Sequence, residues 1–280
     1  MTDTMQTDMA APQAPKRRRL PRLSPRLCLI VLAGLIIAAT SLHTVMFLAS
    51  SREERLAAAT RDTRNLALLL EEHAARSMQA ADLMLRGVID ALALQPASMM
   101  VDQDGMIGLL KQRLVNAPQV RALLIVDRHG RNAGDTSDLP PPPSLADREY
   151  FRFLRDNPSA ALHISRPGRS VTTGLWYIAV SRPIKDFNGQ FNGVAVAFVE
   201  PEFFKATYGA IQSSQNGVVA LMTQDLTLLA RVPDVGERIG ETVQGPLLSQ
   251  AVAQDGTHGT YRSRSTIDGL ERIYSYRQVD

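Results

Sequence analysis

An uncharged apolar stretch near the N-terminus constrains this chain more than any other feature. Residues 27–49 read LCLIVLAGLIIAATSLHTVMFLA and carry no formal charge. About 23 such residues form a helix long enough to cross a hydrocarbon core of roughly 30 Å. A cleaved signal peptide has a shorter apolar region, of about 7–15 residues, followed by small residues at the cleavage site. The sequence therefore predicts an uncleaved transmembrane helix over residues 27–49.

The charges on the two sides of this stretch predict its orientation. Six basic residues precede it, namely Lys16, Arg17, Arg18, Arg19, Arg22 and Arg26. The charges that follow it, in residues 52–55, are balanced. Because basic flanks stay in the cytoplasm, we expect residues 1–26 to form a disordered cytoplasmic tail. Residues 50–280 are then periplasmic or extracellular, and the protein lies in the cell inner membrane. The tail also supplies the net charge of +3, which is therefore no evidence for nucleic-acid binding.

A long stalk helix is predicted over residues 50–95. The sequence has no Pro or Gly between Ser51 and Arg86, and apolar or small residues such as Leu66, Leu70 and Ala74 recur at helical spacing. A narrow apolar stripe of this kind often pairs with its copy in a homodimer. The stripe can equally pack on the domain that follows, and the pattern leaves both alternatives open.

After the stalk the pattern changes from helical periodicity to strands separated by turns. Helices are expected at 107–116 and 147–154, and strands at 120–127, 132–137, 163–166, 176–183 and 193–199. A connector helix over 200–209 leads to a weaker copy, with strands at 217–222, 226–231, 259–262 and 272–277 and a helix at 246–254. Because the chain stops close to a strand, we expect the second sheet to be incomplete, with a further membrane helix and an output domain beyond residue 280.

Two short motifs, in this order after the two helices, resemble the double Cache (PAS-like, PDC) sensor region of bacterial transmembrane receptors. They are Asp147-Arg148-Glu149-Tyr150-Phe151 and Ser181-Arg182-Pro183-Ile184, ahead of a Phe-x-Gly-Val strand. The resemblance covers about residues 50–280 and is greatest to regions that precede diguanylate cyclases (GGDEF) and sensor histidine kinases. It implies an α+β fold in which a transmembrane helix and a stalk helix precede tandem PAS-like antiparallel sheets.

The same resemblance implies a division of labour between two lobes. A membrane-distal lobe over residues 96–208 would bind a small molecule, and an incomplete membrane-proximal lobe over 209–280 would relay the signal. The chain departs from the amino-acid-binding form of the family at two positions. Gly174 stands two residues before Trp176 where that form has Arg, and Glu200 replaces its later Asp. These departures weaken the case for amino acids as ligands.

Arginines beside aromatic residues predict the ligand-binding site, because a guanidinium binds a carboxylate through two parallel hydrogen bonds. The candidate residues are Tyr150, Arg152, Arg166, Trp176, Tyr177, Ser181, Arg182 and Glu200. Strand alternation puts Trp176 and Arg182 on one face and Tyr177 and Ser181 on the other, and does not say which face meets the ligand. We expect Arg182 to anchor a small organic anion.

The sequence offers no sign of catalysis. It has no nucleophile, metalloprotease or phosphate-loop motif, and its histidines lack metal-ligand spacing. We therefore expect no enzyme activity, no metal and no cofactor within residues 1–280. The expected function is an extracytoplasmic small-molecule sensor that passes ligand binding to a cytoplasmic output domain. The alternative is a membrane-anchored module that only dimerises or binds a partner protein.

Overall fold

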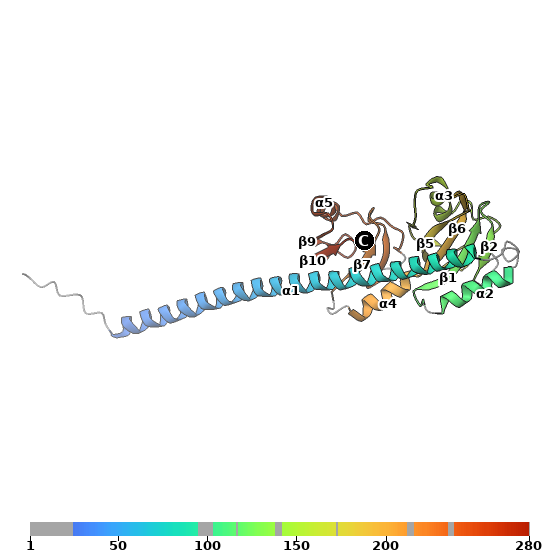
Figure 1. Cartoon of the computed structure of the whole chain (residues 1–280). Helices are drawn as coiled ribbons and strands as arrows, with labels where there is room; N and C mark the ends of the chain where they lie inside the picture. The colour runs from blue at the N-terminus through green and yellow to red at the C-terminus, as the bar shows by residue number, and fades with distance from the viewer. Residues whose placement is uncertain are drawn as a thin grey trace, which may run out of the picture. The chain divides into compact units, whose positions relative to one another are not determined.

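The chain forms an α+β structure in which one very long helix precedes three antiparallel sheets (Figure 1). The computed structural model describes residues 25–94, 103–115, 117–137, 142–171, 173–211, 216–234 and 238–279. The expected disordered tail lies outside the described residues, except for its last two residues, which belong to the first helix. The chain divides into two compact units, residues 1–57 and 58–280.

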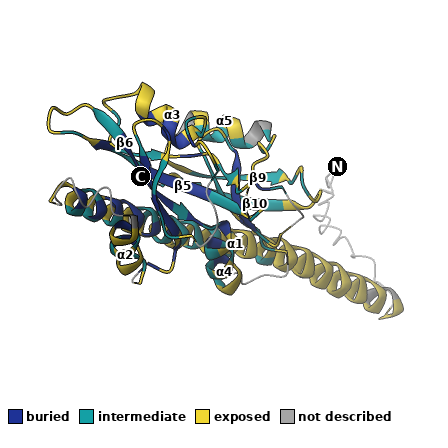
Figure 2. Cartoon of the chain, turned by 90° about the vertical axis from the view of Figure 1, so that its right-hand side faces the viewer, coloured by how far each residue is buried: buried dark blue, intermediate teal, exposed yellow. Residues whose placement is uncertain are grey.

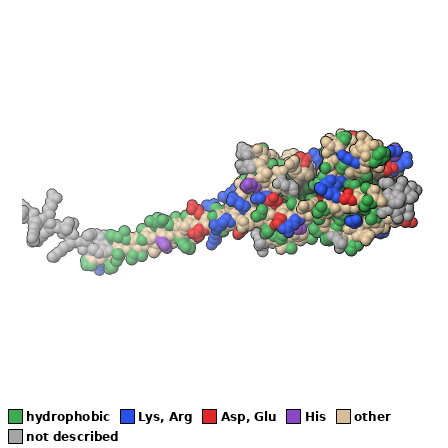
Figure 3. Space-filling view, in the orientation of Figure 1, with side chains coloured by type: hydrophobic (Ala, Val, Ile, Leu, Met, Phe, Trp, Pro, Cys, Tyr) green, Lys and Arg blue, Asp and Glu red, His purple; other side chains and the backbone are tan. Residues whose placement is uncertain are grey.

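Helix α1, Pro25–Ala93, is continuous over 69 residues and runs through both units. Its N-terminal proline is compatible with the first turn, where the backbone N–H has no helical partner. Helix α1 is long and apolar enough to cross a membrane by length and composition. Figure 3 shows hydrophobic side chains along its N-terminal part, followed by a stretch where acidic and basic side chains gather.

The largest sheet is antiparallel and has the strand order β2-β1-β6-β5-β3. Its strands are β1, Val120–Asp127; β2, Asn132–Asp135; β3, His163–Ile164; β5, Trp176–Lys185; and β6, Phe191–Val199. A two-residue strand β4, Gly168–Arg169, pairs with the start of β5. The predicted strands are therefore found, although β3 is shorter than expected and β4 was not expected.

Helices cover both faces of this sheet, as Figure 2 shows. Helix α1 and helix α2, Gln103–Leu114, pack on one face, where β5 contributes Ile178 and Val180 to the core. Helix α3, Glu149–Asp156, packs on the other face, where β5 contributes Ala179 and Tyr177. The predicted alternation along β5 is thus confirmed. Apolar residues fill both faces because this sheet is buried between two helical layers.

The C-terminal region consists of two hairpins and two helices. Helix α4, Pro201–Ile211, leads into the hairpin of β7, Val219–Met222, and β8, Leu228–Val232. Helix α5, Pro246–Asp255, precedes the hairpin of β9, His258–Arg264, and β10, Glu271–Arg277. These elements match the weaker copy that the sequence predicts, but each hairpin forms a separate two-stranded sheet.

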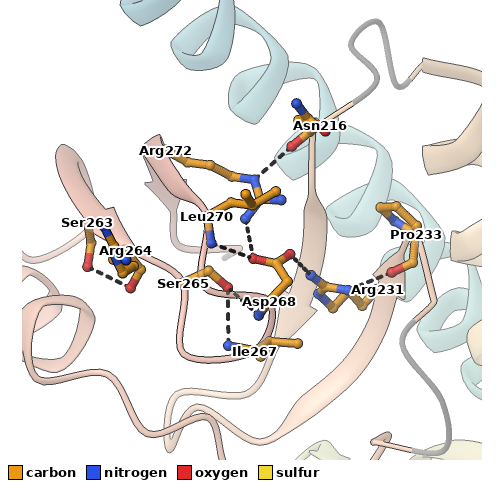
Figure 4. A network of polar contacts seen from close by, with 10 residues as sticks. All are labelled: Asn216, Arg231, Pro233, Ser263, Arg264, Ser265, Ile267, Asp268, Leu270 and Arg272. Atoms are coloured by element: carbon orange, nitrogen blue, oxygen red, sulfur yellow. Dashed lines mark hydrogen bonds and ion pairs between the residues drawn. The ribbon is translucent and has the colours of Figure 1, made fainter.

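A network of polar contacts joins these two hairpins (Figure 4). The Asp268 carboxylate accepts hydrogen bonds from Arg231 of β8, at 3.2 Å, and from Arg272 of β10, at 2.6 Å. Arg231 also donates to the Pro233 carbonyl, and Arg272 to the Asn216 carbonyl, each at 2.7 Å. The Arg272 guanidinium is the main reason that the pKa of Asp268 lies far below its ordinary value. The buried charge of Arg231 is therefore compensated.

Candidate functional site

Helix α3 forms the cover of the candidate site. Tyr150, Phe151 and Leu154 are buried against the large sheet, whereas Arg152 and Arg155 on the outer side are exposed. The spacing i, i+1, i+4 places the three apolar side chains on one helical face, which explains why this short segment folds as an amphipathic helix against the sheet. The residues just before and at the start of α3 are charged, and they lie where the cover meets the sheet.

Two tyrosines meet beneath this cover. The rings of Tyr150 and Tyr177 both pack edge-on against Phe198 of β6, with centroid distances of 6.0 and 4.9 Å. Burial raises the pKa of Tyr150, and Tyr177 raises it further. Burial is also the main cause that raises the pKa of Tyr177. No described residue hydrogen-bonds either phenolic hydroxyl, so both remain available to a ligand.

A glycine makes room for the Tyr177 phenol. Gly168 of β4 lies directly opposite Tyr177 in the strand register. A Cβ atom at Gly168 would lie 2.5 Å from Cζ and 2.6 Å from the hydroxyl oxygen of Tyr177. Any larger residue would therefore displace the ring, because the mainchain of β4 and the end of the phenol share this space. Strand β4 thus sets the position of the Tyr177 hydroxyl.

Charged groups surround the two phenols. Arg148 lies close enough to lower the pKa values of both tyrosines, Asp135 raises that of Tyr150, and Glu149 raises that of Tyr177. Glu149 is already occupied, because its carboxylate accepts hydrogen bonds from the Arg166 backbone N–H, at 3.3 Å, and contacts His163 Nε2 at 3.1 Å. By contrast, the guanidinium of Arg148 has no hydrogen-bond or ion-pair partner among the described residues.

The sequence predicted this site only in part. Tyr150 and Tyr177 come together beneath α3 as described above, and Ser181 lies on the same face of β5. Ser181 is fully buried, and its hydroxyl donates to the His163 carbonyl at 3.1 Å, so this bond already uses its proton. Arg148 and Asp135 were not among the predicted site residues. The signal for Arg148 was its place in the motif Asp147–Phe151, directly before the first residue of α3 and two residues before Tyr150.

Arg182, the expected anion anchor, lies on the opposite face of the sheet from the tyrosines and is not brought together with them. Its guanidinium forms a two-point ion pair with Asp82 of α1, of which the Nη2–Oδ2 bond measures 2.9 Å. The side chains of Arg182 and Asp82 are only 14% and 11% exposed. The physical reason is the alternation of β5, since a residue five positions after Tyr177 points to the other face.

The remaining predicted residues also lie away from the two phenols. Arg152 is exposed on the outer side of α3. Glu200, just after β6, forms an ion pair with Arg121 at 2.9 Å. Trp176 contacts Gly240 of the C-terminal region. Arg166 lies at the border of the site, with its backbone bonded to Glu149 and its guanidinium paired with Asp225.

The described residues contain no group of three or more His, Cys, Asp or Glu side chains that could hold a metal ion. The chemistry that this face of the sheet offers is hydrogen bonding and charge pairing. One buried and one partly buried phenol, one unpaired guanidinium and one nearby carboxylate lie beneath and beside an amphipathic helix. Such a set can bind a small polar molecule in a largely apolar environment, where each polar contact orients the ligand.

Comparison with known proteins places the fold. A family model described as a histidine kinase sensor domain (dCache_1-like) matches residues 201–280. The extracellular domain of the putative histidine kinase rpHK1S-Z16, known from a crystal structure, has 30% sequence identity with this chain and a TM-score of 0.72. The match covers 80% of this chain and 91% of that chain. No curated protein sequence matches the chain significantly.

Two chemoreceptor domains share the fold at lower identity. The ligand-binding domain of Pseudomonas fluorescens CtaA, in complex with L-isoleucine, has a TM-score of 0.59 and 16% identity over 80% of this chain and 87% of that chain. The domain of Campylobacter jejuni Tlp3, in complex with 4-methylisoleucine, has a TM-score of 0.55 and 10% identity over 77% of this chain and 84% of that chain. The chain therefore belongs to the double Cache (dCache_1-like) family of extracellular ligand-binding sensor domains of histidine kinases and chemoreceptors.

Proposed function

We propose that the face of the large sheet beneath α3 binds a small ligand that carries a carboxylate. The observation that carries this proposal is the unpaired guanidinium of Arg148, next to Glu149 at the start of α3, whose charge acts on both the Tyr150 and the Tyr177 phenol. A guanidinium and two hydroxyl donors can together satisfy both oxygens of one carboxylate. Because the site is partly desolvated, such charge-assisted hydrogen bonds would be stronger than in water. Arg148 thus takes the role that the sequence had suggested for Arg182.

An α-amino acid is the ligand class that this set of groups fits best. Asp135, whose charge is felt at Tyr150, would pair with the ligand ammonium while Arg148 pairs with its carboxylate. The chemoreceptor domains that share this fold were crystallised with L-isoleucine and 4-methylisoleucine, which supports a ligand of this size. The two sequence departures noted above, at Gly174 and Glu200, lie outside this group of residues, so they do not weigh against it.

The test compares two arginine variants of the outer domain. Purified residues 50–280 would be titrated by calorimetry with the L-amino acids and with short carboxylic acids. The change Arg148→Gln removes the proposed anchor, and we expect a loss of affinity of about tenfold or more, the usual effect of removing a charged hydrogen-bond donor. The change Arg152→Gln, on the exposed side of the same helix, serves as the matched control and should leave affinity unchanged. Equal affinity in both variants would eliminate Arg148 as the anchor.

The order of segments along the chain supports a receptor. We propose that residues 27–49 cross the inner membrane, that residues 1–26 stay in the cytoplasm, and that residues 50–95 form the stalk. The large sheet would belong to a membrane-distal lobe over 96–208 and the C-terminal region to a membrane-proximal lobe over 209–280. The signal would pass to a cytoplasmic output domain, a histidine kinase or a diguanylate cyclase.

A homodimer through α1 is favoured by a separate observation. Leu68, Leu69 and Leu83 are 48%, 58% and 58% exposed on the part of α1 that belongs to the outer domain. Half-exposed leucines at these spacings form a seam that a second copy would cover. We expect the outer domain to sediment as a dimer and the double variant Leu69→Glu, Leu83→Glu to sediment as a monomer that still melts cooperatively. A wild-type domain that remains monomeric at high concentration would exclude this interface.

A further inference from the structure

The large sheet and the C-terminal region meet at the only tryptophan of the chain. Trp176, the first residue of β5, packs against Gly240, which adopts a positive φ of 88°. A Cβ atom at Gly240 would lie 3.2 Å from Cη2 of Trp176 and 3.9 Å from Cγ of Pro167. Gly240 is itself held by a backbone hydrogen bond to Leu228 of β8, at 2.9 Å. The tryptophan ring therefore rests on backbone that is tied to the β7–β8 hairpin.

A second contact joins the same two parts of the molecule. The guanidinium of Arg166, between β3 and β4, forms an ion pair with Asp225 in the turn between β7 and β8. That turn is ordered around Asp225, which accepts hydrogen bonds from the Thr223 and Thr227 hydroxyls. On the other side, the backbone N–H of Arg166 donates to Glu149, the first residue of α3. A continuous set of contacts thus runs from the cover helix to the β7–β8 hairpin.

Both contacts begin next to groups of the candidate site. Trp176 and Tyr177 are consecutive in β5 and point to opposite faces, so one short stretch of backbone carries both the phenol and the indole. Glu149 lies between Arg148 and Tyr150 in sequence, and its carboxylate is bonded to the Arg166 backbone N–H, so α3 and Arg166 are directly connected. Strand β4 adds to this coupling, because Gly168 pairs with Tyr177 and Arg169 pairs with Trp176.

We infer that Trp176 and Arg166 are positioning residues, which couple the ligand site beneath α3 to the β7–β8 hairpin of the C-terminal region. This inference rests on the proposed function for the identity of the site, but not for the coupling itself. Two residues that the sequence suggested as ligand contacts thus transmit the position of α3 instead. A ligand that draws α3 toward the sheet can shift the contacts of Trp176 and Arg166 with the β7–β8 hairpin. It does so only if it binds the shifted and the unshifted conformation with different affinity.

The coupling can be tested without a ligand, by perturbing the hairpin side and observing α3. The change Asp225→Asn removes the ion pair to Arg166. We expect hydrogen exchange of the α3 amides to become faster by at most about fivefold, which is the largest effect expected when an exposed ion pair is lost. The change Asp225→Glu should restore wild-type exchange. The matched control is Asp234→Asn, which removes the 2.7 Å contact to Lys205 of α4 and should leave α3 unchanged. Unaltered α3 exchange in Asp225→Asn would overturn the inference.

The tryptophan contact has its own test. Because Trp176 is the only tryptophan, its fluorescence reports on this contact directly. The change Gly240→Ala places a methyl group against the ring, and we expect a shifted emission maximum together with faster α3 exchange. Gly256→Ala is the control, since Gly256 has a similar positive φ of 67° and no neighbour within 4 Å of a Cβ atom. If Gly240→Ala shifts the emission but leaves α3 exchange as in the control, this contact carries no coupling and the inference fails for Trp176.

A ligand experiment separates this inference from the proposed function. Each of the L-amino acids would be added while Trp176 emission and calorimetric heat are followed. Heat with a change in emission supports both proposals, and heat without any change in emission or in hairpin exchange overturns the coupling alone. If none of them produces heat, the amino-acid ligand is rejected, and the ligand-free exchange data then decide the coupling by themselves.

Discussion

At the scale of single residues, the ion pair between Asp82 and Arg182 holds α1 against the large sheet. Both side chains are nearly buried, and Asp82 accepts a further contact from Arg86 at 3.0 Å. Burial alone would raise the pKa of Asp82, but the hydrogen bond and the charge of Arg182 outweigh it and keep that pKa below its ordinary value. The carboxylate therefore stays ionised and compensates the Arg182 charge.

The change Asp82→Asn should destabilise the outer domain strongly. It leaves the Arg182 guanidinium without an anionic partner in a nearly buried position, which costs about 3 kcal/mol, the lower end of the range for breaking buried ion pairs. Urea unfolding measures this loss. The matched control is Glu72→Gln, which removes an exposed i,i+4 ion pair with Arg76 on the same helix and should cost at most about 0.5 kcal/mol. Equal effects of the two changes would show that Asp82 is no more important than a surface carboxylate.

The same ion pair shows why strand alternation alone could not place Arg182 relative to α3. Strand alternation correctly separates Tyr177 from Arg182, but nothing in the local pattern says which face a helix such as α3 will cover. That choice depends on where α1 packs, and the partner of Arg182 is 100 residues earlier in the chain. Arg148 was harder to find because it lies outside any strand, so no periodicity assigns its side chain to a face.

At the scale of secondary-structure elements, an aromatic cluster joins α1 to α4. The His73 ring of α1 stacks on Phe203 at a centroid distance of 5.5 Å and lies edge-on to Phe204 and Tyr208. Its Nδ1 atom is buried without a hydrogen-bond partner among the described residues. Burial lowers the pKa of His73 from its ordinary value of 6.5. Protonation would place a charge, and a second N–H, where neither is stabilised.

This cluster predicts that the stability of the outer domain decreases in acid. Because His73 binds a proton more readily in the unfolded state, its contribution is fully present above pH 6.5 and is lost as the pH falls through the lowered folded-state pKa. We expect the change His73→Phe to reduce the fall in melting temperature between pH 7.5 and pH 5.5. The control His129→Gln alters an exposed histidine in the β1–β2 turn. A pH dependence that is the same in both variants would contradict this role of His73.

The accuracy of the predicted element boundaries depends on how regular the apolar pattern of each element is. The hydrophobic strands β1 and β6 and the amphipathic helix α3 were predicted to within two residues, because each has several apolar side chains in a regular period. Strand β4 has only two residues, one of which is a glycine. Two residues are too few to show any period, so only the pairing with β5 defines this strand. The separation of the β7–β8 and β9–β10 hairpins is likewise a matter of pairing between distant segments, which local patterns do not encode.

At the scale of the whole molecule, the family resemblance and the apolar stretch support each other. The fold is that of extracellular sensor domains, and such a domain must be delivered across the membrane by some segment of its chain. Among the described residues, α1 is the one helix that is long and apolar enough to cross a membrane. The order of elements could be predicted from sequence because it depends on local patterns, whereas the ligand site required knowledge of which distant segments meet.

The proposed orientation can be tested with single cysteines, because the only native cysteine is Cys28. In a Cys28→Ser background, Asn188→Cys places a thiol on the exposed β5–β6 turn, and Thr7→Cys places one in the N-terminal tail. The basic flank before the apolar stretch should keep the tail inside. We therefore expect a membrane-impermeant maleimide to label Asn188→Cys in intact spheroplasts and Thr7→Cys only after lysis. Labelling of Thr7→Cys but not Asn188→Cys in intact spheroplasts would place the candidate site in the cytoplasm, where it could not sense an extracellular ligand.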